Sequence, residues 1–276
     1  MTMGSEQYLD DLLVAILKES GAEDPRLPRD IESRRLTLRA YMNVRHPMPI
    51  PDGMLRLQDA YLMERNAERG VFRADDIPTV DTALGCMLSS ADRMSLWQGD
   101  ITTLDCDAIV NAANSQMLGC FSPNHKCIDN CIHTYAGMQL RLECHRRMTE
   151  LRNVFGKGYE QPTSVPMLTG AYNLPCRHVI HVVGPIAIPF KTPQHERDLA
   201  QCYRNVLDMC RDNGIRSVAF CCISTGVFGF PNDRAAEIAV GTVSEWLDDD
   251  DSVDKVIFNV FLDKDRALYE EVLTRE

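Results

Sequence analysis

One short segment of the chain carries three side chains of the kinds that bind zinc. Cys120, His125 and Cys127 lie together in the segment CFSPNHKC. Thiolate and imidazole are the ligands that zinc prefers, and three of them on one loop can face a single ion. Pro123 stiffens the loop and lowers the entropy lost on binding. We therefore predict one Zn2+ per chain at these three residues.

The number of protein ligands indicates what such a zinc does. Structural zinc sites usually have four, whereas catalytic sites have three and keep one position for water or substrate. Three ligands are local here, which favours an open, functional site. Cys131 and His133 follow closely in the sequence, so a fourth protein ligand remains an alternative.

A glycine-bearing turn follows one of the predicted strands. The segment STGVFGFP at 224–231 comes directly after the apolar run at 218–223 and precedes a predicted helix. Successive backbone N–H groups in such a turn, together with the start of a helix, can hold a phosphate or diphosphate without lysine. An ordinary connection between a strand and a helix is the alternative.

Two further segments carry polar residues where apolar runs end, GDIT at 99–102 and AIVNAAN at 108–114. The amides of Asn111 and Asn114 can bond ligand hydroxyls, since each offers donors and an acceptor. Asp100 can accept from an exocyclic amine or serve as a turn residue. His181, inside the apolar run VIHVV, is predicted to be a core histidine. His133, near the start of a predicted helix, is predicted to bond backbone groups.

The scaffold that positions these residues follows from hydrophobic periodicity. Leu9, Leu12, Leu13 and Ile16 share one helical face, and further helices are predicted at 30–44 and 53–69, followed by a linker over 72–88. Beyond residue 90, strands are predicted near 94–97, 106–111, 164–169, 178–183, 217–223 and 256–261, with helices over 128–144, 193–213, 232–247 and 263–274. This alternation predicts an α/β domain over 86–276 with a mostly parallel sheet, preceded by a helical extension over 1–85.

Composition excludes several classes of protein. The chain has 276 residues and a net charge of −11, which argues against binding nucleic acid through its overall charge. We expect no signal peptide at the start and no membrane span, because the apolar runs are short. Eleven cysteines without an export signal predict reduced thiols and a cytoplasmic location.

In combination, these segments resemble the macrodomain family, whose members are ADP-ribose-binding modules. The motifs that carry the resemblance occur in the family's order over residues 93–262. They are GDIT, AIVNAAN, the D-x-x-I-H-x-x-A-G pattern of 129–137, GAYNLP at 170–175, VIHVVGP at 179–185 and STGVFGFP. The resemblance implies a three-layer α/β fold with a mixed, mostly parallel sheet between helices.

The chain departs from the usual macrodomain pattern in front of Asp129. Ordinary hydrolytic members have a glycine-rich stretch there, whereas this chain has GCFSPNHKCID. That segment resembles the zinc-containing subfamily, whose members are protein-ADP-ribose hydrolases with a helical N-terminal extension.

The resemblance implies a role for each matching residue. Asp100 would bond the adenine amine beside the backbone of Ile101. Asn111, Asn114 and Asp129 would face the distal ribose, with Asn114 and Asp129 as the catalytic candidates, and zinc would lie next to that ribose. The backbone that would hold the diphosphate belongs to Ser224, Thr225, Gly226, Val227 and Phe228, and Phe228 would also form a pocket wall.

We therefore predict a zinc-dependent hydrolase that removes mono-ADP-ribose from modified protein side chains, with esters of Asp or Glu as substrate. Asp129 would orient or deprotonate water or a ribose hydroxyl. Whether zinc supplies the nucleophile or positions the ribose is left open. The alternatives are a reader module with structural zinc and an O-acetyl-ADP-ribose deacetylase. The resemblance also suggests a lipoylated carrier protein and a sirtuin-type ADP-ribosyltransferase as partners.

Overall fold

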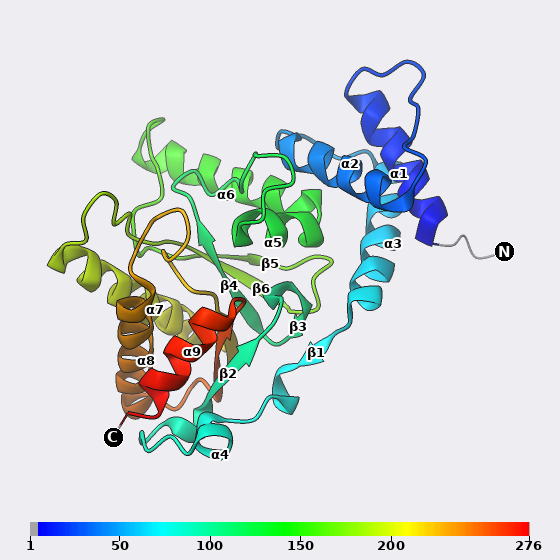
Figure 1. The fold of residues 1–276 in the computed structure, drawn as a ribbon. Helices are drawn as coiled ribbons and strands as arrows, with labels where there is room; N and C mark the ends of the chain where they lie inside the picture. Colours follow the sequence, from blue (N-terminus) through cyan, green and yellow to red (C-terminus); the bar gives the residue numbers. More distant parts are fainter. Residues whose placement is uncertain (1–4, 276) are drawn as a thin grey trace. The chain divides into compact units, whose positions relative to one another are not determined.

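The computed structural model describes residues 5–275 of the chain. These form two compact units, and Figure 1 shows the helices and strands of which they consist. The first comprises the residues up to 71 together with 118–159 and 171–175, and the second comprises 72–117, 160–170 and the residues from 176 onward. We predicted a single domain boundary at residues 85–86. Each unit instead combines segments from different parts of the sequence, which does not test a single boundary, so this boundary stays a prediction.

The first unit begins with the three predicted helices, α1 (Ser5–Glu19), α2 (Ile31–Val44) and α3 (Asp52–Arg69). The Asp30 side chain accepts from the backbone N–H of Ser33 and so caps the start of α2. The apolar faces of the three helices pack on one another around a buried cluster. Its members include Leu9, Leu12, Leu13, Ile16, Leu38, Met42, Tyr61 and Leu62.

The long helix predicted over 128–144 is wrong, because the structure has two helices there. They are α5 (Ile128–Ala136) and α6 (Met138–Phe155), separated by Gly137. Gly137 has φ +98°, outside the helical region, and its N–H still bonds the carbonyl of His133. A Cβ at Gly137 would lie 2.6 Å from Gln58 Nε2. The apolar spacing continues across the break, so periodicity alone does not reveal it.

The second unit starts in the segment predicted as a linker. That segment instead contains β1 (Phe72–Arg73), a 3-10 turn at Ala74–Asp76 and the short helix α4 (Val80–Leu84). β1 pairs in parallel with β3 (Leu104–Asp105). Elements this short carry too little periodicity to be recognised in the sequence.

The main sheet of the second unit has six strands in the order β2-β8-β7-β4-β6-β5. Their bounds are β2 Met94–Gln98, β4 Ala108–Ala113, β5 Met167–Gly170, β6 His178–Val183, β7 Ser217–Phe220 and β8 Lys255–Val260. Neighbouring strands are parallel except for β5, which runs antiparallel to β6. The central strands are buried along nearly their whole length, as expected for a sheet covered on both faces. The predicted mixed, mostly parallel sheet is confirmed.

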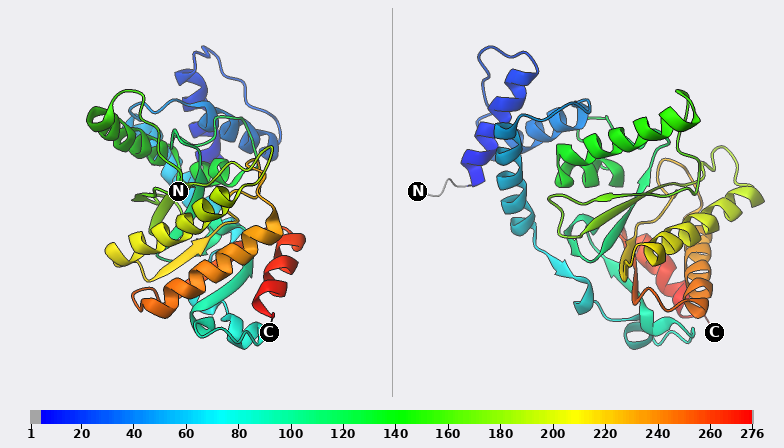
Figure 2. Two further views of the ribbon diagram at one scale, coloured as in Figure 1. Left: turned by 90° about the vertical axis from the view of Figure 1, so that its left-hand side faces the viewer. Right: turned by 180° about the vertical axis from the view of Figure 1, so that it is seen from behind.

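Three longer helices belong to this unit, namely α7 (Pro193–Asp212), α8 (Asn232–Asp249) and α9 (Asp263–Leu273). They match the predicted helices within one or two residues, and α7 begins with a capping box at Thr192. Figure 2 shows α7 and α8 lying side by side. No helix within residues 5–275 is both long and apolar enough to cross a bilayer.

Candidate active site

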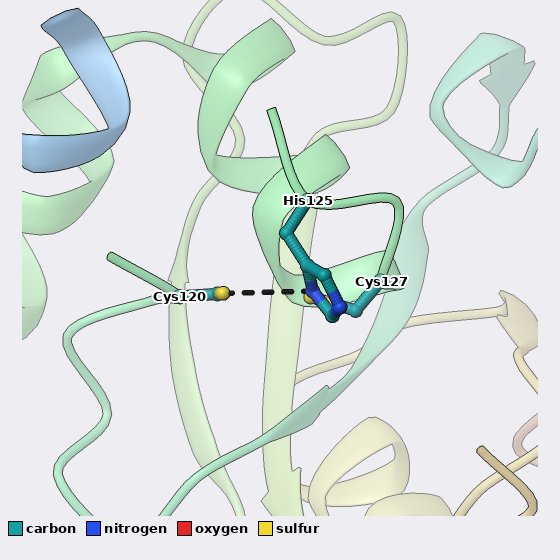
Figure 3. A group of neighbouring side chains, drawn as sticks. All are labelled: Cys120, His125 and Cys127. Atoms are coloured by element: carbon teal, nitrogen blue, oxygen red, sulfur yellow. Dashed lines mark hydrogen bonds between the residues drawn. The ribbon is translucent and has the colours of Figure 1, made fainter. Parts of the chain in front are cut away.

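The three predicted metal ligands lie together on the loop that precedes α5 (Figure 3). The Sγ atoms of Cys120 and Cys127 and a ring nitrogen of His125 all lie within 4.8 Å of one another. Cys120 Sγ is 3.7 Å from His125 Nδ1. A tetrahedral zinc with bonds of about 2.3 Å to sulfur and about 2.0 Å to nitrogen holds two such atoms roughly 3.6 Å apart. The donor types and the Cys120–His125 distance suit a zinc ion, whose presence stays a prediction.

The neighbouring residues do not add a fourth ligand to this group. Within residues 5–275, neither Cys131 nor His133 belongs to the cluster of three. Arg39 Nη2 lies 3.4 Å from Cys131 Sγ, and His133 Nε2 lies 3.5 Å from an Asp129 oxygen. This contact is to a side-chain carboxylate, so the predicted bond from His133 to backbone groups stays a prediction. The donor set matches the three-ligand pattern of open zinc sites.

Cys127 occupies the N-cap of α5, and its Sγ accepts from the N–H of Asn130 at 3.4 Å. Burial raises the pKa of the Cys127 thiol, with the nearby Cys120 adding to the effect. The N-terminus of a helix favours negative charge, so it stabilises the thiolate that a metal requires. The N-cap position of Cys127 therefore offsets part of the free-energy cost of ionising this buried thiol.

Asp129 lies in the first turn of α5, two residues beyond Cys127, and is only 5% exposed. Its negative charge interacts with the guanidinium of Arg141, a side chain that is also buried. Burial lowers the pKa of Arg141 to about 10, and the charge of Asp129 acts in the opposite direction. A buried carboxylate with this cation nearby can stay ionised and hold a polar group in a fixed orientation.

The adenine candidates lie in the second unit, just after β2. Asp100 caps the 3-10 turn Ile101–Thr103, and its Oδ1 accepts from the N–H and the hydroxyl of Thr102. Ile101 is almost completely buried. Asp100 therefore serves as a turn residue, as one of the two alternatives predicted. Its hydrogen bond to the adenine amine stays a prediction.

The two asparagines of the second unit differ in their surroundings. Asn111 is fully buried within β4, where its Nδ2 lies 3.0 Å from Nδ1 of His181 on the adjacent strand. His181 Nε2 lies 3.0 Å from the hydroxyl of Thr169, which confirms the predicted core histidine. Asn114 follows β4, and its Oδ1 accepts from the N–H of Gln116. The ligand roles of both asparagines stay predictions.

The loop after β7 has the open N–H groups that an anion needs. Thr225, Gly229 and Phe230 donate their N–H groups within the loop. Among the described residues, the N–H groups of 226–228 have no protein acceptor. Ser224 has φ +65° and sharply turns the chain as it leaves the sheet. This arrangement favours the predicted anion-binding turn over an ordinary connection.

The loop depends on a glycine that the sequence does not single out. A Cβ on Gly184, just beyond β6, would collide with Oγ of Ser224 and lie 2.7 Å from Ile223. Gly184 belongs to the VIHVVGP motif, so the motif was the only signal that could have identified it. Its missing side chain leaves room for the turn at Ser224.

Comparison with known proteins identifies the family. A model of the macro domain matches residues 110–239. Proteins named protein-ADP-ribose hydrolase from Treponema medium and from Staphylococcus aureus strain MSSA476 are 46% and 42% identical, and the matches cover 90% and 91% of this chain. They cover 91% and 88% of those relatives.

Two solved structures show the same fold. An Oceanobacillus iheyensis macrodomain with ADP has a TM-score of 0.57 and 37% identity, over 65% of this chain and 89% of that one. A Trypanosoma brucei macrodomain in complex with ADP-ribose has a TM-score of 0.62 and 28% identity, over 81% of this chain and 91% of that one. With near full-length relatives at this identity, the chain belongs to the macro domain family.

Proposed function

We propose that this protein is a zinc-dependent hydrolase that releases mono-ADP-ribose from modified protein side chains, with acidic side chains as the favoured linkage. The proposal rests chiefly on the cluster of Cys120, His125 and Cys127, whose ligand atoms lie within 4.8 Å of one another. The buried carboxylate of Asp129 follows in the next turn of the chain. The name protein-ADP-ribose hydrolase, carried by close relatives, supports the activity.

The second unit would bind the ADP-ribosyl group. The N–H groups of 226–228 have no acceptor among the described residues and would bond the diphosphate. The net charge of −11 makes such a local device necessary, because the overall field of the protein repels an anion. Solved relatives that hold ADP or ADP-ribose support this part of the proposal.

Gly226→Val is expected to weaken ADP-ribose binding tenfold or more, equivalent to about 1.4 kcal/mol. A Cβ at Gly226 meets nothing within 4 Å in the protein itself, so the free protein should keep its thermal stability. The new side chain would add bulk beside the N–H groups of 226–228, where the diphosphate would bind. Isothermal titration calorimetry with ADP-ribose measures the change.

Gly241→Val on α8 is the matched control, since a Cβ there also meets nothing within 4 Å. It should leave both stability and affinity unchanged. Normal affinity of Gly226→Val would reject the diphosphate role of this loop.

Cleavage of an ADP-ribosyl ester needs a nucleophile and stabilisation of negative charge on oxygen. Zinc in an open site supplies Lewis acidity that serves both needs. Cys120, His125 and Cys127 would hold the ion, and Asp129 would orient the attacking water or a ribose hydroxyl. The charge of Arg141 would help to keep Asp129 ionised.

The deciding experiment measures release of free ADP-ribose from a carrier protein that is mono-ADP-ribosylated on acidic side chains. Zinc-loaded and chelated samples of the full chain are compared. Turnover that vanishes on chelation and returns with added zinc would support the proposal. Turnover that is unaffected in protein verified to be metal-free would reject zinc dependence.

Two other outcomes correspond to the alternative functions. Tight ADP-ribose binding without turnover in either sample would identify a reader module. Turnover of O-acetyl-ADP-ribose alone would identify a deacetylase of that small molecule. A lipoylated protein modified by a sirtuin-type ADP-ribosyltransferase is the carrier that the family resemblance suggests. The proposed location is the cytoplasm, where a reducing environment would keep the eleven cysteines of the chain as thiols.

A further inference from the structure

The second helix of the N-terminal extension contacts the metal-binding loop within the first unit. Arg39 and Asn43 lie one turn apart on α2, and both reach the segment 120–134. Their partners are more than 80 residues away in the sequence. No family motif of the chain includes either residue, and the proposed hydrolysis does not use them.

Arg39 donates hydrogen bonds to the backbone of His125 and to the side chain of Asn130. Its Nη2 donates to the carbonyl of His125 at 2.8 Å, and Nη2 and Nε donate to Oδ1 of Asn130 at 2.8 and 3.2 Å. One guanidinium therefore fixes two points of the loop. A planar fork of donors suits such a double contact better than a single ammonium group does.

Asn130 transmits this contact to the two cysteines. It is fully buried, and its Nδ2 donates to the carbonyls of Cys120 and Ser122 at 3.3 and 3.0 Å. Its backbone N–H donates to Sγ of Cys127. With Oδ1 held by Arg39, the amide orientation of Asn130 is determined. Arg39 thus contacts His125 directly and Cys120 through the Asn130 side chain, while Cys127 is bonded by the backbone N–H of the same Asn130.

Asn43 holds the turn between the ligands. Its Oδ1 accepts from the N–H of Asn124 at 3.0 Å, and its Nδ2 donates to Thr134 Oγ1 on α5. Asn124 has φ +55°, a left-handed conformation that turns the chain into His125. Asn43 is itself 1% exposed, so it cannot turn away without losing buried hydrogen bonds.

The end of α2 is held by a further side chain of the first unit, Arg141, which also stacks on Phe121 of the metal-binding loop. The buried guanidinium of Arg141 on α6 donates to the carbonyls of Met42, Asn43 and Arg45 at the end of α2, at 2.8 to 3.1 Å. A cation at this end of a helix binds the last carbonyls and complements the helix dipole. Arg39 and Asn43 therefore act from a helix whose end is itself held by buried hydrogen bonds.

We infer that α2 positions the zinc-binding loop, with Arg39 and Asn43 as its positioning residues. This inference rests on the proposed zinc site. It gives the N-terminal extension a definite role, because the ligands all lie outside the extension while their backbone is held by it. Groups that orient metal ligands in this way usually contribute 10–100-fold to metal affinity.

The test measures the zinc dissociation constant of the full chain by competition with a chromophoric chelator. Arg39→Ala is expected to raise that constant about 10–100-fold. Arg39→Lys should give an intermediate value, since a lysine cannot reach both acceptors in the same geometry. Asn43→Ala should raise the constant as well.

Arg35→Ala is the matched control. Arg35 lies one turn earlier on α2 and bonds only Glu32 and Glu68 among the described residues, at 2.7 and 3.0 Å, away from the loop. It should keep the zinc affinity of the unaltered protein.

Four results separate the inference from its premise. An unaltered protein that binds no zinc rejects the proposed function. Equal zinc affinity of the unaltered protein and Arg39→Ala rejects the inference alone. An equal loss in Arg35→Ala also rejects it, because the effect would then come from general weakening of α2. If Arg39→Ala fails to fold, Arg39→Lys and Asn43→Ala decide by the same measurement.

Discussion

Cys127→Ala is expected to abolish zinc binding and to lower turnover of a mono-ADP-ribosylated protein about a thousandfold or more. With three protein ligands in the cluster, loss of one leaves two, too few for a stable site. The Lewis acidity lost is worth several kcal/mol, and ~4 kcal/mol corresponds to about a thousandfold in rate. Metal analysis of the purified protein and a single-turnover assay provide the measurement.

Cys131→Ala is the matched control for this prediction. Cys131 is a half-buried cysteine four residues further on, outside the group formed by Cys120, His125 and Cys127. The variant should retain one zinc per chain and most of the turnover. Loss of zinc from Cys131→Ala would instead make that cysteine a fourth ligand. Retained zinc in Cys127→Ala would refute the assignment of the loop.

Asp129→Asn is expected to reduce kcat about 10²–10⁴-fold while the dissociation constant of ADP-ribose changes less than about threefold. The substitution keeps the size of the side chain but removes the charge that would orient water or a ribose hydroxyl. It also leaves buried Arg141 without the opposing charge, so some loss of thermal stability is expected. Turnover, affinity, zinc content and melting temperature are measured together.

Glu143→Gln on α6 controls for the general loss of an acidic group in this unit. Like Asp129, Glu143 raises the pKa of the buried Cys144, after the larger effect of burial. It bonds Tyr172 and Arg147, and it should keep normal turnover. Equal losses of turnover and of affinity in Asp129→Asn would make Asp129 a binding residue only.

Most of the architecture could be predicted because its signals are local. The helices of the extension repeat apolar residues every three or four positions, and the strands His178–Val183 and Lys255–Val260 consist mostly of apolar residues. Errors arose where the local pattern continued through a break. Gly137 separates two helices whose apolar residues continue the same four-residue spacing. The break at Gly137, where φ is +98°, therefore could not be predicted from hydrophobic periodicity.

The grouping of Cys120, His125 and Cys127 was predictable for the same reason. The three residues lie on one short loop, so their side chains can come together independently of the rest of the fold. Asn111 shows the limit of that reasoning. The sequence placed it at the end of an apolar run, but the register of β4 and β6 sets its amide against His181, 70 residues away.

The candidate ligand types, the order of strands and helices along the chain, and the glycine-bearing loop could all be inferred from the sequence, because each is a property of neighbouring residues. Which distant residues support them follows from the three-dimensional packing. Arg39 and Asn43 reach the metal loop because the apolar face of α2 packs in the first unit and Arg141 binds the end of that helix. Such contacts depend on packing between segments far apart in the chain, and no local spacing encodes them.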